Sequence, residues 1–518
     1  MADVPDSSSI NHRSDATAPP TIKDASPLTE DFSDLLEAME QELFEAFHDG
    51  VVHNPLGAAS YVYQTDLAKP LLRMLGLIPV SAKLSSPGPD TPSAIDGDDD
   101  GSEDASSDGS SDADSGVSFT HEGTSSTLYI HIGAQPNNSP HAGTIITFAL
   151  AFLLARQLQR EYPKLRARAL SSSSSPSPTC ACDDSLWADD LRVVVQLDLV
   201  DTAPDSTRTS THEGIVYQRS HRSTGAMHAF LPDYVRLLRE LDAFVGGEVA
   251  YEVAYQEDMM RMPGMRDAVR TILLDRDRVA VELAPRREAL AMRSACPEEG
   301  CGLADKHGVR NAYEVGPERT VIRFHCPVHG AYKLILEKPE ELARLELNTP
   351  LRNLARALLY MRDTSASRVP GQAVPTRLHM RVTGSDYSGM YQEQLLFRQL
   401  SKLRRVAGLD PRMRAALEEA EDPVFVYAPL VVDWSGAKMS KSLYVKEHAY
   451  RYLEGLDRSF LLEYRKMCEQ GRDRGVLFRA VEGWVREPAK LFRPYSLEYL
   501  HLLFVREESL GRGVVQDA

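Results

Sequence analysis

The stretch STLYIHIGAQPNNSPHAGTIITFALAFLLARQLQREY, residues 126–162, decides the fold class. Its first ten residues are rich in β-branched and aromatic side chains, which predicts a strand. A strongly apolar helix is expected from about His141 to Tyr162. Further along, LRVVVQLDLV (191–200) has the composition of a buried parallel strand. A strand, a crossover helix and a second parallel strand form a βαβ unit, so the sequence predicts an α/β protein.

The turn between the first strand and its helix, PNNSPHAGT (136–144), is rich in Gly, Asn and Pro. α/β folds bind nucleotides at such turns, because free backbone N–H groups and the helix dipole face a phosphate there. His141 and Gly143 stand at the first turn of the helix. A histidine at a helix start can also be a cap or a surface residue, so the position alone does not decide its role.

Two further loops follow predicted strands. VVDWSGAKMSKSLYV (431–445) is an apolar run that ends in a turn and then places Lys438 and Lys441 three residues apart. An ordinary solvated loop would explain two such lysines. Between a strand and a helix, LHMRVTGSDYSGMYQEQLLFRQL (378–400) carries Gly384 and Asp386. A turn with a helix-capping Asp is the simple interpretation of that segment.

Taken together and in order, these motifs resemble the signatures of the class I aminoacyl-tRNA synthetases. Residues 438–442 are KMSKS, and PHAGT resembles HIGH, with Thr144 where the second histidine belongs. Gly384 and Asp386 match the Gly-x-Asp at a strand end. The resemblance covers roughly residues 125–450 and is nearest to the lysyl and arginyl branches. It implies a doubly wound, Rossmann-like parallel sheet.

The resemblance also implies roles for these residues. Lys441, with Lys438 beside it, would meet the charge on leaving pyrophosphate, and His141 would contact the polyphosphate. Gly143 would leave room for adenosine against the helix. Besides Lys438, Lys441 and His141, the residues expected to bind nucleotide or substrate are Gly133, Asn138, Gly143, Thr144, Gly384, Asp386, Gln392 and Ser440. ATP and Mg would be cofactors if the protein adenylates, and tRNA and amino acids would be its partners.

Four residues outside these motifs have metal-ligand spacing. Cys296 and Cys301 form C-x4-C, and Cys326 and His329 form C-x2-H after a long gap. Turn-forming Pro and Gly flank both pairs, as in a zinc knuckle with four ligands around a tetrahedral ion. Unrelated buried thiols are the alternative. We therefore expect a structural zinc in a subdomain inserted between the two halves of the sheet.

Three functions compete on this basis. The first is a biosynthetic enzyme that uses aminoacyl-tRNA to form amide bonds, as the fungal arginine-containing cyclodipeptide synthases do. It is favoured by the shortness of the sequence after KMSKS, where two or three helices stand instead of an anticodon-reading domain. The second is an ATP-dependent aminoacyl-tRNA or amino-acid ligase, which intact KMSKS favours. The third is a synthetase-like scaffold without turnover, which the altered HIGH motif allows.

The composition is that of an ordinary soluble globular protein, and 518 residues are enough for two or three domains. Hydrophobic residues make up 42% and charged residues 26%. The net charge is −17, but ten acids lie in Asp90–Gly116, so the balance neither predicts nor excludes a nucleic-acid partner. No secretory signal is evident, and the run 145–155 is shorter than the roughly 20 residues that span a bilayer. We expect a cytoplasmic protein that does not enter a membrane.

The expected organisation follows from these patterns. It is a disordered segment (1–27), a helical N-terminal segment (28–84), a disordered acidic tract (85–126), a first half of the catalytic core (127–290) with a flexible insert (171–186), a zinc-knuckle insertion (291–335), a second half of the core with the KMSKS loop (336–450), and a short helical C-terminal segment (451–518).

Overall fold

The computed structural model describes residues 66–78, 125–172, 187–370, 374–433, 435–439 and 450–511. All of them belong to one compact unit, Val52–Ala518. Of the expected N-terminal helical segment only 66–78 is described, and there helix α3 spans Ala68–Met74. The segment 1–27, nearly all of the acidic tract and most of the insert 171–186 lie outside the described residues.

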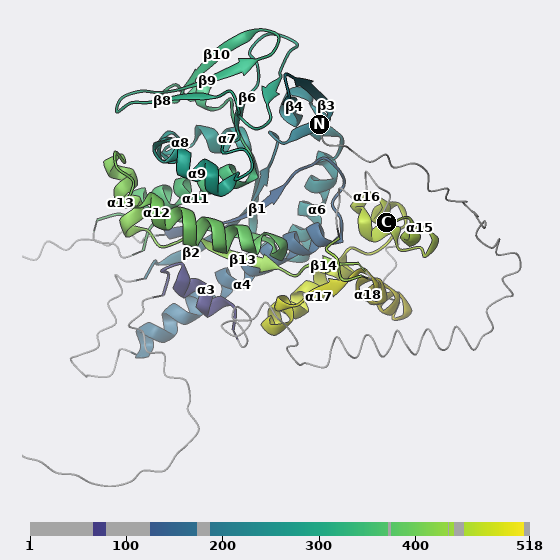
Figure 1. The fold of residues 1–518 in the computed structure, drawn as a ribbon. Coiled ribbons are helices and arrows are strands. Elements are labelled where there is room, and N and C mark those ends of the chain that lie inside the picture. Colours follow the sequence, from purple (N-terminus) through teal and green to yellow (C-terminus); the bar gives the residue numbers. More distant parts are fainter. Residues whose placement is uncertain are drawn as a thin grey trace, which may run out of the picture. The chain divides into compact units, whose positions relative to one another are not determined.

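A five-stranded parallel sheet forms the centre (Figure 1). Its strands are β1 (Ser125–Ala134), β2 (Asp190–Leu199), β5 (Ala250–Tyr255), β12 (Arg377–Gly384) and β13 (Val424–Ala428). They lie in the order β13-β12-β1-β2-β5, and all neighbouring pairs are parallel. From β1 the chain therefore adds strands on one side and later returns to the other side. This confirms the predicted α/β class with a parallel sheet.

Helix α4 (Ala142–Ser172) is the crossover from β1 to β2, and it is longer than the sequence pattern predicted. It continues through Pro163, because Leu165 and Ala169 beyond that proline still bury their side chains. By length and composition α4 could also cross a membrane. However, 67% of its most apolar window is buried inside the protein.

The two faces of the sheet differ in chemistry. Leu128, Ile130 and Ile132 of β1 are fully buried on one face, and α4 packs against β1 and β2. His131 points to the opposite face, since successive side chains of a strand alternate. There it meets Tyr360 of helix α11 (Thr349–Ala366). One face is thus a conventional apolar core, and the other carries buried polar groups.

Small antiparallel sheets occupy the region expected to be the zinc knuckle (291–335) and include strands from before and after it. β8 (Ala312–Val315), β9 (Thr320–Cys326) and β10 (Gly330–Ile335) form one of them (Figure 1). β6 (Met292–Ser294) pairs with β11 (Leu345–Leu347). A third sheet joins β3 (Pro204–His212), β4 (Ile215–Ser220) and β7 (Ala304–Asp305).

The remaining helical segments before the KMSKS loop are α5 (His221–Thr224), η2 (Ala226–Ala229), α6 (Leu231–Phe244), α7 (Gln256–Arg261), α8 (Met265–Leu274), α9 (Arg276–Leu283), α10 (Pro339–Leu342), η3 (Ser385–Tyr387), η4 (Gly389–Leu400), α12 (Ser401–Leu403) and α13 (Pro411–Glu419). After the loop come α15 (Arg451–Gly455), η5 (Ser459–Leu462), α16 (Tyr464–Glu469), α17 (Gly475–Arg486), η6 (Pro488–Phe492) and α18 (Leu497–Ser509).

These last helices pack onto the core. β14 (Val431–Val432), just before the KMSKS loop, pairs with β15 (Tyr495–Ser496). Helix α17 packs against α4, and Trp484 of α17 stacks on Tyr495 with ring centroids 4.1 Å apart. Residues 450–511 therefore pack on the core and pair with the strand that precedes the loop.

Candidate active site and candidate metal centre

The switch point of this sheet lies between the C-terminal ends of β1 and β12. The chain runs from β1 to β2 on one side, and it reaches β12 on the other. α/β sheets of this kind bind ligands outside the strand ends at such a point. The turn with His141 follows β1, and Asp386 follows β12. Both predicted motifs thus start from adjacent strands.

His141 has a structural role at the start of α4. Its carbonyl accepts hydrogen bonds from the backbone N–H groups of Thr144 and Ile145 at 2.8 and 3.0 Å. The N–H of Thr144 also lies 3.3 Å from the ring Nδ1 of His141. A Cβ on Gly143 would lie 3.1 Å from the His141 ring and 3.5 Å from Val431. The lack of a side chain at Gly143 therefore leaves room for the His141 ring, and Val431 of β14 lies within van der Waals reach of the same position.

The first half of the KMSKS loop reaches the Gly-x-Asp segment. Lys438 forms an ion pair with Asp386 and lies 5.8 Å from the ring centroid of Tyr387. Backbone contacts hold the start of the loop against β14. Lys438 forms an isolated antiparallel β-bridge with Val432, and the N–H of Met439 donates to the carbonyl of Val431 at 2.9 Å. Two motifs separated by about fifty residues therefore meet at this edge. Ser440 and Lys441 lie outside the described residues.

The other predicted binding residues have partners within the protein. Asn138 is buried, and its Oδ1 accepts from the N–H of Ser139 at 2.8 Å. Gln392 donates to the hydroxyl of Tyr427 at 3.0 Å. A Cβ on Gly384 would lie 2.5 Å from Oδ1 of Asp386, so glycine there allows the carboxylate its position. Thr144 is half-buried in the first turn of α4.

A buried charge network near this edge escaped the sequence analysis. Asp198 of β2 is 7% exposed and lies 3.1 Å from Arg381 of β12, 3.6 Å from Arg356 of α11 and 3.4 Å from His131 of β1. Burial alone would raise the pKa of Asp198, but Arg356, His131 and Arg381 hold it far below its usual range. The sequence did contain a signal for this network, namely a lone Asp within an apolar strand. Acids are rarely buried without partners, so such an Asp predicts buried cations beside it.

The position of Arg381 explains why residue 133, one of the predicted binding residues, is a glycine. A Cβ at that position would lie 2.4 Å from a guanidinium nitrogen of Arg381. The glycine therefore lets the guanidinium lie against the end of β1, beside Asp198, to which Gly133 is register-paired. Gly133 thus supports the charge network.

Two histidines extend the network along the sheet. Nε2 of His131 lies 3.0 Å from Nδ1 of His379, whose Nε2 lies 3.0 Å from Asp363. Tyr360 stacks on both rings, at 4.3 and 4.2 Å between centroids. Burial lowers the pKa of His131 to about 4, even though Asp198 opposes the shift. His131 is therefore neutral in the folded protein at neutral pH.

Protonation of His131 should make stability fall in mildly acidic solution. The unfolded chain binds a proton at His131 near pH 6.5, whereas the folded protein does so only near pH 4. Stability is therefore lost as pH falls from about 6.5 to 4, by on the order of 3 kcal/mol from this group. We expect His131→Gln to remove this part of the loss, as measured by urea unfolding across that pH window.

The control is His228→Gln, which removes an exposed histidine of η2. It should follow the wild-type pH dependence. A His131→Gln curve that ran parallel to the wild-type curve over the whole window would contradict this prediction.

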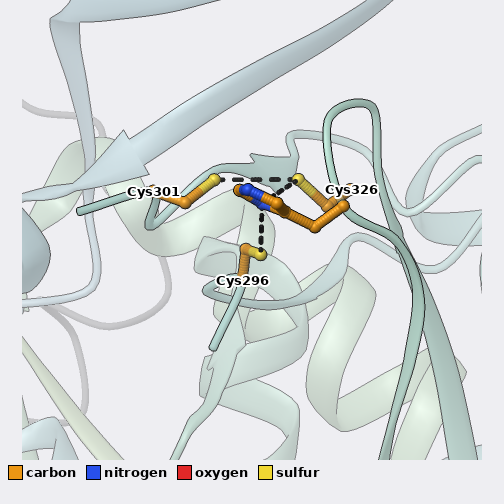
Figure 2. Close-up of side chains that lie close together, drawn as sticks. Cys296, Cys301 and Cys326 are labelled. Carbon is orange, nitrogen blue, oxygen red and sulfur yellow. Dashed lines mark hydrogen bonds between the residues drawn. The ribbon is translucent and has the colours of Figure 1, made fainter. Parts of the chain in front are cut away.

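The four predicted metal ligands lie together (Figure 2). Their ligand atoms are all within 4.8 Å of one another. The Sγ atoms of Cys301 and Cys326 are 3.7 Å apart, and Nδ1 of His329 lies 3.5 and 3.7 Å from those of Cys296 and Cys326. The three cysteines are buried and His329 is exposed. The prediction that these four residues converge is confirmed.

These distances match a tetrahedral ion. With Zn–S near 2.3 Å and Zn–N near 2.0 to 2.1 Å, two ligand sulfurs lie about 3.8 Å apart and a sulfur–nitrogen pair about 3.6 Å. Burial raises the pKa of the Cys326 thiol, but backbone hydrogen bonds from Val328 and His329 outweigh this effect and lower the pKa to about 7. Burial raises the pKa of Cys296 to about 12. This Cys3His cluster could hold a metal ion.

Comparison with known proteins adds little detail. No family model and no curated protein matches the sequence. Among solved structures, the arginyl-tRNA synthetase of Thermus thermophilus is similar, with 14% identity and a TM-score of 0.24. The match covers 76% of this chain and 65% of that chain, so this chain spans less than two thirds of the synthetase.

Proposed function

We propose that the protein is a class I synthetase-like enzyme that handles activated amino acids in the crevice between β1 and β12. The observation that carries this proposal is the ion pair of Lys438 with Asp386 at the switch point. It places the first lysine of the KMSKS loop beside the strand end where the resembling enzymes hold their adenylate. The approach of β14 to Gly143 brings the HIGH-like turn to the same edge.

The first version of this function uses aminoacyl-tRNA to form amide bonds, as in tRNA-dependent cyclodipeptide synthesis. The ester of aminoacyl-tRNA is already activated, so an amine can attack it and release the tRNA hydroxyl without ATP. Residues 450–511 pack onto the core, and β15 pairs with the strand just before the KMSKS loop, so in this version they would serve the core itself.

The second version is an ATP-dependent ligase of the lysyl or arginyl class I type. A carboxylate would attack the α-phosphate of ATP, and pyrophosphate would leave with the charge that lysines of the loop are placed to meet. The position of Lys438 supports this version. Mg with ATP would then be required, and tRNA and amino acids are the partners in both versions.

One assay separates the versions. Purified aminoacyl-tRNA is supplied without ATP, and products are identified by mass spectrometry. Turnover supports the first version, whereas strict ATP dependence with pyrophosphate release supports the second. If neither condition gives a product or exchange with any amino acid, the enzyme proposal is wrong and the protein is a synthetase-like scaffold.

The Cys3His cluster is proposed to bind a structural zinc. Four soft or borderline ligands fill a tetrahedral shell, which leaves no position for a reacting water. The site ties the loop before Cys301 to the β9–β10 turn, and thereby holds the inserted subdomain together.

A further inference from the structure

A cationic pocket of ≈ 240 Å³ lies beyond the ends of β1 and β2, outside the residues proposed for amino-acid activation. Gln135 follows β1 and Thr202 follows β2, and both line it. So do Arg293, Lys306 and Arg352. None of the described residues that line this pocket is an Asp or a Glu. The polar part of the lining therefore consists of cations and neutral groups, and the rest is apolar, with Val200, Ala291 and Leu347 among its residues.

Arg352 is the decisive residue, because it is buried without a negative partner. It is 8% exposed, and its guanidinium donates to neutral acceptors, the carbonyl of Leu347 at 3.3 Å and the hydroxyl of Thr349 at 3.2 Å. Its Nε has no partner. Among the described residues no carboxylate forms an ion pair with it. A buried charge without a counter-charge is costly, so this arrangement favours an anion from outside.

Two buried acids of this region, Asp198 and Glu346, already have cationic partners. Asp198 is already shared by Arg381 and Arg356, the latter one turn further along α11. Burial, with Arg356 and Arg381 nearby, lowers the pKa of Arg352 to about 9, so Arg352 is still charged at neutral pH. The other acid close by, Glu346, faces Arg293 at 3.3 Å.

The remaining groups add positive potential at the same place. Arg293 is 3% exposed and, besides Glu346, donates to the carbonyl of Thr202, but its Nε has no partner. Lys306 is half-buried at the rim. Asn348 and Thr349 line the pocket at the N-terminus of the eighteen-residue helix α11, where the helix dipole also favours an anion.

We infer that this pocket binds a phosphate group of a nucleotide or of an RNA end. Arg352 and Lys306 together supply two charges that no carboxylate of the described residues neutralises. A phosphate with a charge of about −1.5 to −2 matches them, whereas a carboxylate supplies only one charge. A guanidinium fork also suits the geometry of phosphate oxygens. The site does not depend on His141, Asp386 or the KMSKS loop.

The test is binding of inorganic phosphate to the full-length protein at constant ionic strength, measured by calorimetry and by the shift in melting temperature. The wild type should bind it saturably. Arg352→Gln should weaken binding about tenfold or more, because a charge-assisted hydrogen bond is lost. In phosphate-free buffer the same variant should melt no lower than the wild type, since an uncompensated buried charge has been removed.

Two further variants make the test specific. Lys306→Gln, at the rim, is expected to fold normally and to weaken phosphate binding as well. Arg412→Gln is the matched control, because Arg412 is an exposed arginine of α13 outside the pocket. It should bind phosphate like the wild type. Absence of saturable binding by the wild type, or unchanged binding by both Arg352→Gln and Lys306→Gln, would overturn the inference.

Competition then identifies the source of the phosphate. Displacement of bound phosphate by ATP assigns the site to a nucleotide, and displacement by a short RNA ending in CCA assigns it to RNA. Phosphate binding that neither ligand displaces would show a site for the free ion only, and would overturn the assignment to a substrate group. Because the readout is binding, failure of the proposed enzymatic function would leave this result unaffected.

Discussion

Removal of the proposed structural zinc should cause the largest loss of stability in this protein. Zinc binds structural Cys and His sites in small zinc-finger peptides with roughly 10–16 kcal/mol, which is comparable to the whole net stability of a domain. We expect chelation, or Cys326→Ser, to lower the melting temperature strongly. Hydrogen exchange should show that β9 and β10 lose their protection, because Cys326 ends β9 and His329 lies in the turn to β10.

Cys468→Ser is the matched control for this experiment. Cys468 is a free, partly buried cysteine of α16 that is not among the four clustered residues. The control should retain one zinc per chain and the wild-type melting temperature. Purified protein without stoichiometric zinc, together with equal stability of the two serine variants, would contradict the proposed metal centre.

Substitution of Lys438 by Ala should separate activity from stability. The side chain of Lys438 is 47% exposed, and exposed ion pairs contribute only about 0–1 kcal/mol, so the melting temperature should hardly change. If the enzyme activates its amino acid with ATP, loss of a group that meets charge in the transition state should slow pyrophosphate release by about 10²–10³-fold. Lys441→Ala should have at least as large an effect.

With pre-charged tRNA as substrate a different result is expected. No pyrophosphate leaves, so the lysines can only assist tRNA binding, and Lys438→Ala should weaken binding in a salt-dependent way. Lys402→Ala is the control, since Lys402 is also paired with a carboxylate, that of Glu282, and its side chain is 46% exposed. It should leave both reactions unchanged. Full activity of Lys438→Ala in both reactions would remove the loop from the proposed mechanism.

The sequence by itself determined the parts of this protein that depend on local order. Alternation and apolar runs predicted β1, α4 and β2, because strands and helices leave their periods in the chain. The spacing of the cysteines, with turn residues beside each pair, predicted a metal cluster whose four members do converge. The end of α4 was predicted too early, because tertiary burial of Leu165 and Ala169 outweighed the helix-breaking tendency of Pro163.

Only the tertiary structure decided which distant charges meet. Asp198, His131 and Arg381 lie on three different strands, and they come together because the register pairs His131 with Arg381 and places Asp198 beside the end of β1. The pocket proposed to bind phosphate likewise needs the start of α11 to lie beside the ends of β1 and β2. A one-residue change of register would turn these side chains to the other face. Such pairings depend on strand order and register, which local sequence patterns do not encode.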